Sequence, residues 1–127
     1  MSSALSPLAE SWVAYWREYD STGNVPDDND ASEELRDLAR TDPDVAWDAI
    51  IQILGLLEPK SENPLFQSLA AGPLEDLLGD NGPAVIDRLE AEARQNSHFN
   101  LLLGGVWKGR MSQDIWERVA KCRLSVW

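Results

Sequence analysis

Residues 42–57, with the sequence DPDVAWDAIIQILGLL, decide the fold class of this chain. Asp42 is a typical helix-capping residue. Pro43 suits the first turn of a helix, because its missing N–H would have no intrahelical partner there. After them, apolar residues recur every three or four positions, namely Val45, Ala46, Ala49, Ile50, Ile53, Leu54 and Leu57. This spacing predicts an amphipathic helix that lies deep in a core and ends before Pro59.

Prolines mark further helix starts. Asn63-Pro64 and Gly82-Pro83 each place a capping residue before a proline, which predicts two new helices. Between them lies Gly72-Pro73, where we expect a kink or a break, because proline disfavours helical geometry in the residue before it. Gly79 is expected in a left-handed position at a helix end. The prolines at 43, 64 and 83 are spaced by about 20 residues, the length of a short helix plus its connection.

The two ends of the chain also predict helices. A first helix over residues 7–20 and a second that opens with Asp30 and Glu33 precede the segment above, and Ser97 and Ser112 are expected to cap two later ones. We expect Trp107 to pack beside the end of the helix that follows Ser97. Residues 21–31 predict an exposed acidic loop, and residues 124–127 predict an exposed tail.

No segment has the alternating pattern of a strand. The sequence therefore predicts one all-α domain over residues 1–127. It should hold about seven short helices in a compact bundle or a small solenoid-like array of helical hairpins.

Charge restricts the function of the chain, which has 22 acidic and 11 basic residues and a net charge of −11. Residues 1–64 hold 14 acids and 4 bases, whereas residues 65–127 hold 8 acids and 7 bases. This excess opposes binding to nucleic-acid phosphates or to anionic membranes and favours a basic protein partner. One cysteine, no signal sequence and no long apolar run together predict a cytoplasmic protein.

Several strings resemble a family of small, acidic, uncharacterised bacterial proteins, a domain of unknown function. The most specific is Ala-Ala-Gly-Pro-Leu-Glu-Asp-Leu-Leu at residues 70–78, and others lie at residues 12–17, 82–90, 103–107 and 115–116. The resemblance spans about the whole chain. It supports the helical fold and implies no activity, substrate or cofactor.

Glu75 and Asp76 form the polar centre of that string. They are expected either to stabilise a helix start or to make a polar contact with a partner. Adjacent residues of a helix point about 100° apart, which argues against a general acid–base pair. Trp16 belongs to a stripe with Trp12, Tyr15 and Tyr19, which fits either core packing or an aromatic recognition face.

Asp27, Asp28 and Asp30 lie in the acidic loop and lack the glycine and glutamate of a calcium-binding loop. A solvated loop that attracts a basic partner is the better interpretation. His98 and Cys122 have no second ligand at metal-binding spacing. We therefore expect no catalytic residues, no metal site and no cofactor.

The leading hypothesis is a small acidic protein-binding module, of the immunity or antitoxin kind, that covers a basic surface on another protein. Two alternatives stay open. One is a nucleic-acid mimic that inhibits a DNA-binding protein and carries regular rows of carboxylates. The other is an enzyme built on Glu75, Asp76 and Arg88.

Overall fold

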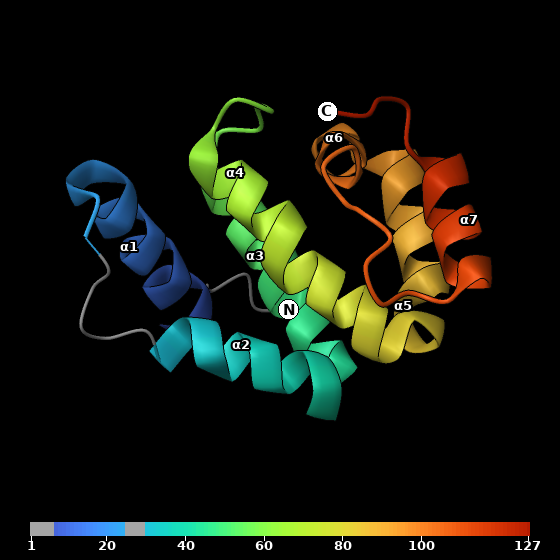
Figure 1. Cartoon of the computed structure of the whole chain (residues 1–127), viewed down its shortest axis with the longest axis horizontal. Coiled ribbons are helices and arrows are strands. Elements are labelled where there is room, and N and C mark those ends of the chain that lie inside the picture. The colour runs from blue at the N-terminus through green and yellow to red at the C-terminus, as the bar shows by residue number, and fades with distance from the viewer. Residues whose placement is uncertain (1–6, 25–29) are drawn as a thin grey trace.

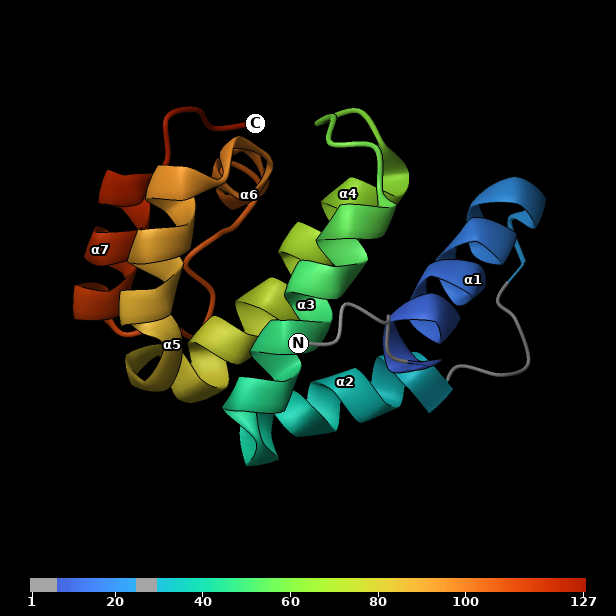
Figure 2. The ribbon, with the colours of Figure 1, turned by 180° about the vertical axis from the view of Figure 1, so that it is seen from behind.

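The computed structural model describes residues 7–24 and 30–127. Within these ranges the chain contains helices and no strand, so the predicted all-α fold is confirmed. The elements are α1 (Pro7–Thr22), α2 (Asp30–Thr41), α3 (Pro43–Leu56), α4 (Pro64–Leu69), the π-helical turn η1 (Ala70–Leu74), α5 (Glu75–Gln95), α6 (Ser97–Leu103) and α7 (Gln113–Cys122). Helices α1 to α4 lie on one side, and α6 and α7 pack against the end of α5 on the other (Figures 1 and 2).

Helix α3 lies between the other helices, as its apolar stripe predicts. Its N-cap is Asp42, whose side chain accepts a hydrogen bond from the backbone N–H of Val45 at 3.3 Å. Its buried side chains are Ala46, Trp47, Ala49, Ile50, Ile53 and Leu54. Val45 departs from the predicted stripe, because its side chain is 44% exposed.

Pro73 does not break the helix that contains it. The chain passes from α4 to α5 through η1, with helical backbone angles at Ala70, Leu74 and Glu75. A π-helical turn holds one more residue than an α-helical turn, and such a turn accommodates a proline that lacks its N–H. The expected kink or break is therefore one wide turn within a continuous helical path.

A second interruption lies at Asn81, where φ is −143° and ψ is 39°. Gly82-Pro83 then begins a second segment of α5 that runs in a different direction (Figure 1). The Asn81 side chain donates hydrogen bonds to the carbonyls of Ala39 at 2.7 Å and Arg40 at 3.1 Å, so it caps the end of α2. The left-handed position expected at Gly79 is wrong, because in the described ranges only Gly23 and Gly109 have positive φ.

The C-terminal segment corrects three expectations. The tail is exposed at Leu124 and Val126, as expected, but Trp127 is half-buried. The Trp127 ring stacks on Phe66 with 5.7 Å between the ring centroids, and its indole N–H donates to the Leu101 carbonyl at 2.7 Å. Trp107, expected to pack, is 67% exposed. Asn96 rather than Ser97 caps α6, whereas Ser112 caps α7 as predicted.

Trp127 lies directly over Gly105, where an added Cβ would fall 2.3 Å from the indole ring. We predict that Gly105→Ala displaces this ring and lowers the free energy of unfolding by about 1–3 kcal/mol in urea denaturation. Gly55→Ala is the control, because Gly55 is exposed in α3 with nothing within 4 Å of the new Cβ, and it should stabilise by up to about 1 kcal/mol. Equal stabilities of the two variants would contradict this packing.

Candidate functional site

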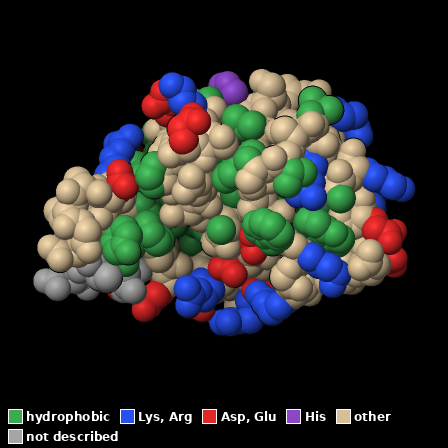
Figure 3. All heavy atoms as spheres, turned by 45° about the horizontal axis from the view of Figure 1, so that its top comes forward, with side chains coloured by type: hydrophobic (Ala, Val, Ile, Leu, Met, Phe, Trp, Pro, Cys, Tyr) green, Lys and Arg blue, Asp and Glu red, His purple; other side chains and the backbone are tan. Residues whose placement is uncertain are grey.

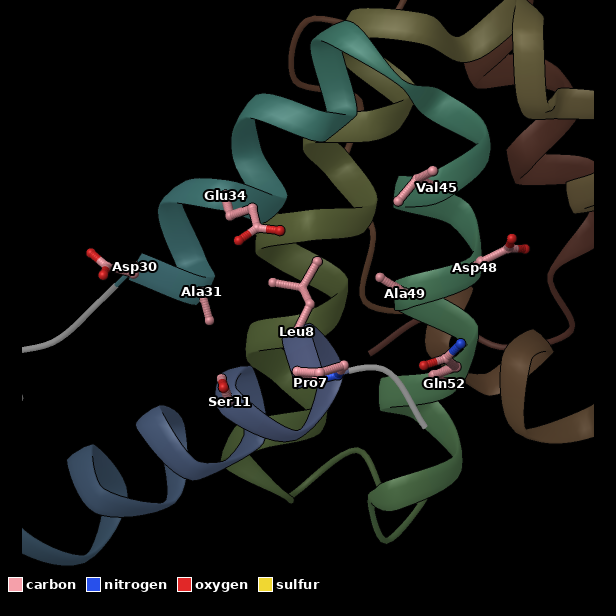
Figure 4. A pocket seen from close by; sticks show the side chains of 10 residues that line it. All are labelled: Pro7, Leu8, Ser11, Asp30, Ala31, Glu34, Val45, Asp48, Ala49 and Gln52. Carbon is pink, nitrogen blue, oxygen red and sulfur yellow. The ribbon is translucent and has the colours of Figure 1, made fainter. Parts of the chain in front are cut away.

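Two hollows flank the pair of helices α1 and α2. The larger, which we call the acid-rimmed groove, has a volume of about 710 Å³ and lies between α1, α2 and α3. Its lining residues are Pro7, Leu8, Ser11, Asp30, Ala31, Glu34, Val45, Asp48, Ala49 and Gln52 (Figure 4). A volume of this size falls in the range of ligand and peptide sites.

The groove has an apolar floor and an acidic rim. Leu8 points into the space between α2 and α3, toward Val45 and Ala49, and Glu34 reaches toward the same space from α2 (Figure 4). Asp30 and Asp48 project outward on the two sides. Among the described residues that line the groove, none is basic. Within the part of the chain that the structure describes, Glu34 and Asp48 form no ion pair.

The smaller hollow, which we call the tryptophan hollow, has a volume of about 340 Å³. Its lining residues are Trp12, Trp16, Ser32, Arg36, Ser68, Ala71, Gly72, Pro73 and Asp76. They come from α1, α2, α4, the π-helical turn and the first turn of α5. The structure thus brings together Trp16 and Asp76, two candidate residues that are 60 positions apart in the sequence. One side of the π-helical turn also lines this hollow, and π-helical turns are frequent at functional sites.

Two polar atoms at the tryptophan hollow have no hydrogen-bond partner. Trp16 Nε1 and Ser32 Oγ are both buried, and among the described residues these two side-chain atoms alone combine burial with a missing partner. An unpaired buried donor or acceptor costs about 1–3 kcal/mol. Three aromatic rings contact the ring of Trp16. Trp12 makes a tilted contact with 5.8 Å between ring centroids, and Tyr15 and Tyr19 make edge contacts with centroid distances of 5.3 Å and 5.6 Å.

Charge at this hollow is balanced between Arg36 and Asp76. Burial raises the pKa of the Asp76 carboxyl, and the positive charges of Arg36 and Arg110 oppose this effect. Arg110 lies 4.0 Å from Asp76 and makes its closer contact with Asp80 at 2.5 Å. Arg36 and Asp76 interact across the hollow without forming an ion pair among the described residues. A carboxylate kept in a desolvated position is a common property of functional sites.

Glu75 faces a different neighbour from Asp76. Its carboxylate accepts the backbone N–H of Trp107 at 3.0 Å, which ties the loop after α6 to the start of α5. Burial raises the pKa of Glu75, and this hydrogen bond opposes the rise. The two adjacent carboxylates therefore have separate partners, and of the two only Asp76 lines the hollow.

The remaining candidates are dispersed. Asp27 and Asp28 lie outside the described residues, whereas Asp30 begins α2 and lines the acid-rimmed groove. Arg88 pairs with Asp44 of α3 and lies over the ring of Trp47 at 5.9 Å, so its contacts are not those of Glu75 and Asp76.

His98 and Cys122 do not contribute to either hollow. His98 is exposed, and burial raises the pKa of the half-buried Cys122 thiol. Residues 7–24 and 30–127 contain no group of three or more His, Cys, Asp or Glu side chains placed to hold a metal ion. Within the same ranges, no helix has the length and apolar character that crossing a membrane requires.

Sequence reasoning missed Ser32 and Arg36. They lie four positions apart and thus on one face of α2, which is the only signal that the sequence offers for their common location. Nothing local indicates that this face looks toward Asp76.

The fold and the two hollows define an all-α protein with one acidic groove and one small hollow that holds unpaired polar groups. The chain belongs to a family of unknown function (DUF6869), whose match covers residues 22–126. The match includes α2 to α7, whereas most of α1, with Trp12 and Trp16, precedes it. No curated protein and no solved structure matches the chain.

Removing the unpaired Ser32 hydroxyl should not destabilise the protein. Ser32→Ala deletes a buried group without a partner and raises helix propensity, so we predict a free energy of unfolding equal to or up to about 1 kcal/mol above wild type. Ser112→Ala is the matched control, because the Ser112 hydroxyl accepts the N–H of Ile115 and its loss should cost about 1 kcal/mol. Urea denaturation of both variants tests this, and a larger loss for Ser32→Ala would count against the unpaired state.

Desolvation of Asp76 should appear in the pH dependence of stability. A raised pKa means that the folded protein holds this proton more tightly than the unfolded chain, so stability falls as pH rises from the ordinary value of 3.8 through the raised pKa. We predict that Asp76→Asn is more stable than wild type near neutral pH and loses less stability over that interval. Urea denaturation across a pH series measures this, and superimposable profiles would refute it.

Proposed function

We propose that this protein is a small acidic protein-binding module whose partner places a basic segment with apolar side chains in the acid-rimmed groove. The observation that carries the proposal is the composition of the groove. The apolar side chains of Leu8, Val45 and Ala49 line it, and carboxylates lie on both of its rims. Val45 is a large apolar side chain that remains 44% exposed, whereas the other large apolar side chains of α3 are buried or half-buried. An apolar floor supplies affinity, and complementary charge supplies speed of association and selectivity.

The distribution of ion pairs supports a basic partner for the N-terminal half. Four of the ion pairs join Arg110 or Arg118 to acids of α5, so much of the charge in residues 65–127 is compensated internally. The face in Figure 3 carries Lys and Arg side chains among hydrophobic ones, so negative charge does not cover the molecule evenly. Glu34 and Asp48, by contrast, leave their charge at the groove.

An immunity-like or antitoxin-like role in the cytoplasm is the specific form that we favour, since such a role needs only a surface that covers a basic protein and no catalytic group. A nucleic-acid mimic is less well supported. Mimicry needs rows of free carboxylates, whereas Asp76, Asp80, Asp87 and Glu90 of α5 are engaged by arginines. We propose no enzymatic activity.

A photo-reactive side chain at Val45, introduced in cells of the host, tests this function. We expect it to cross-link one protein that the same side chain at Glu117 of α7, distant from the groove residues in the sequence, does not capture. The dissociation constant of the purified pair is then measured at several salt concentrations. Glu34→Lys should weaken binding about tenfold or more, and added salt should weaken it as well.

Glu117→Lys is the control for Glu34→Lys, because it changes the net charge equally at an exposed position of α7, a helix that does not line the groove. Its dissociation constant should stay within about twofold of wild type. Equal effects of the two reversals, or the absence of a Val45-specific partner, would reject the proposal. A captured DNA-binding protein from which DNA displaces this chain would support mimicry instead.

A further inference from the structure

We propose that the tryptophan hollow binds a free α-amino acid, with the ligand carboxylate near Arg36, Ser32 and Trp16 and its ammonium group near Asp76. This inference does not rest on the acid-rimmed groove or on a protein partner. It assigns a small-molecule site to a place where the chain holds opposite charges and unpaired polar atoms side by side.

The carboxylate end follows from the donors that the hollow offers. Arg36 supplies a guanidinium with several N–H groups, Ser32 a hydroxyl and Trp16 an indole N–H. The last two have no partner in the protein, and their residues line the hollow, with the two atoms themselves just beneath its surface. A carboxylate accepts several hydrogen bonds at once and binds guanidinium groups well, so it matches this set better than a single carbonyl does.

The ammonium end follows from Asp76. This carboxylate is half-buried at the hollow, and its nearest cation, Arg110, lies 4.0 Å away and is shared with Asp80. Arg36 and Asp76 do not close onto one another as an ion pair among the described residues, which leaves a gap between a cation and an anion. An α-amino acid carries an ammonium group and a carboxylate on the same α-carbon, so it can bridge that gap and satisfy both groups.

Size and shape agree with a ligand of this class. The volume of about 340 Å³ is at the lower end of the range for small-molecule sites. Ala71 and Gly72 have small side chains or none, so the π-helical side of the hollow leaves room for a ligand. A Cβ added at Gly72 would meet nothing within 4 Å. The half-buried ring of Trp16 offers an apolar surface to the ligand side chain.

Binding requires a local adjustment, because Trp16 Nε1 and Ser32 Oγ are closed off from solvent. The proposal therefore includes a rotation of the short Ser32 side chain and a small movement of the indole ring, which together open both atoms to the hollow. The free protein lacks these two hydrogen bonds, so a ligand that makes them gains interactions that do not have to be exchanged for existing protein contacts.

The indole N–H resonance of Trp16 in uniformly ¹⁵N-labelled protein is the most direct readout. The chain has six tryptophans, and Trp16→Phe identifies this resonance by its loss. Each of the common L-amino acids is added to about 10 mM, which detects dissociation constants into the millimolar range. We expect a saturable shift of the Trp16 resonance with at least one amino acid, and no comparable shift with its decarboxylated amine or its deaminated acid.

Variants then assign the two ends of the ligand. Arg36→Gln and Asp76→Asn should each weaken binding about tenfold or more, and Ser32→Ala should weaken it while the protein remains folded. Arg40→Gln and Asp37→Asn make the same chemical changes on exposed positions of α2 that do not line the hollow, and they should leave binding unchanged.

Three results would overturn the assignment. The first is no shift of the Trp16 resonance with any amino acid. The second is an equal shift with the amine or the acid alone, which would show that a zwitterion is not required. The third is equal weakening by Arg36→Gln and Arg40→Gln, or by Asp76→Asn and Asp37→Asn, which would place the ligand elsewhere.

Discussion

Burial of the helical path from Pro64 to Gln95 is the interaction on which the rest of the structure depends. This path packs against α1, α2, α3, α6 and α7, so it joins the two ends of the molecule into one core. Both irregularities in the path have structural consequences. The π-helical turn at Pro73 forms a wall of the tryptophan hollow, and the interruption at Asn81 frees a side chain that caps α2. The path therefore fixes the position of α2, which carries residues of both hollows.

Helix starts were predictable because a cap followed by proline is a local device. Asp42-Pro43 and Asn63-Pro64 begin helices as expected, since the lost N–H is not needed at that position. The same rule does not determine the backbone conformation of the residues that precede the proline. At Pro73 the chain widened into a π-helical turn, whereas at Pro83 Asn81 left the helical conformation and found acceptors on α2. Which solution a proline adopts depends on tertiary partners that a local pattern does not contain.

The candidate site was predictable only in part, for a related reason. The spacing of Trp12 and Trp16 predicts that they share a face, yet it does not tell that Trp12 is fully buried while Trp16 keeps an unpaired N–H beside a hollow. Asp76 was identified from a distinctive string, but its neighbours Ser32 and Arg36 are ordinary residues of an amphipathic helix. Their importance arises from the packing of α2 against α5, which is a long-range contact. Trp127 was missed because stacking on Phe66 is equally non-local.

The two hollows owe their different chemistry to opposite faces of one helix. Glu34 and Arg36 are two positions apart in α2, so their side chains point roughly 200° apart. Arg36 faces the tryptophan hollow and balances Asp76, while Glu34 faces the acid-rimmed groove, which has no basic side chain among its described lining residues. If the arginine lay on the same face of α2 as Glu34, it would neutralise the rim of the acid-rimmed groove. Asp76 would then lack the positive charge of Arg36 across the tryptophan hollow. The order of charges along α2 therefore separates an anionic groove from a charge-balanced hollow within a single helix.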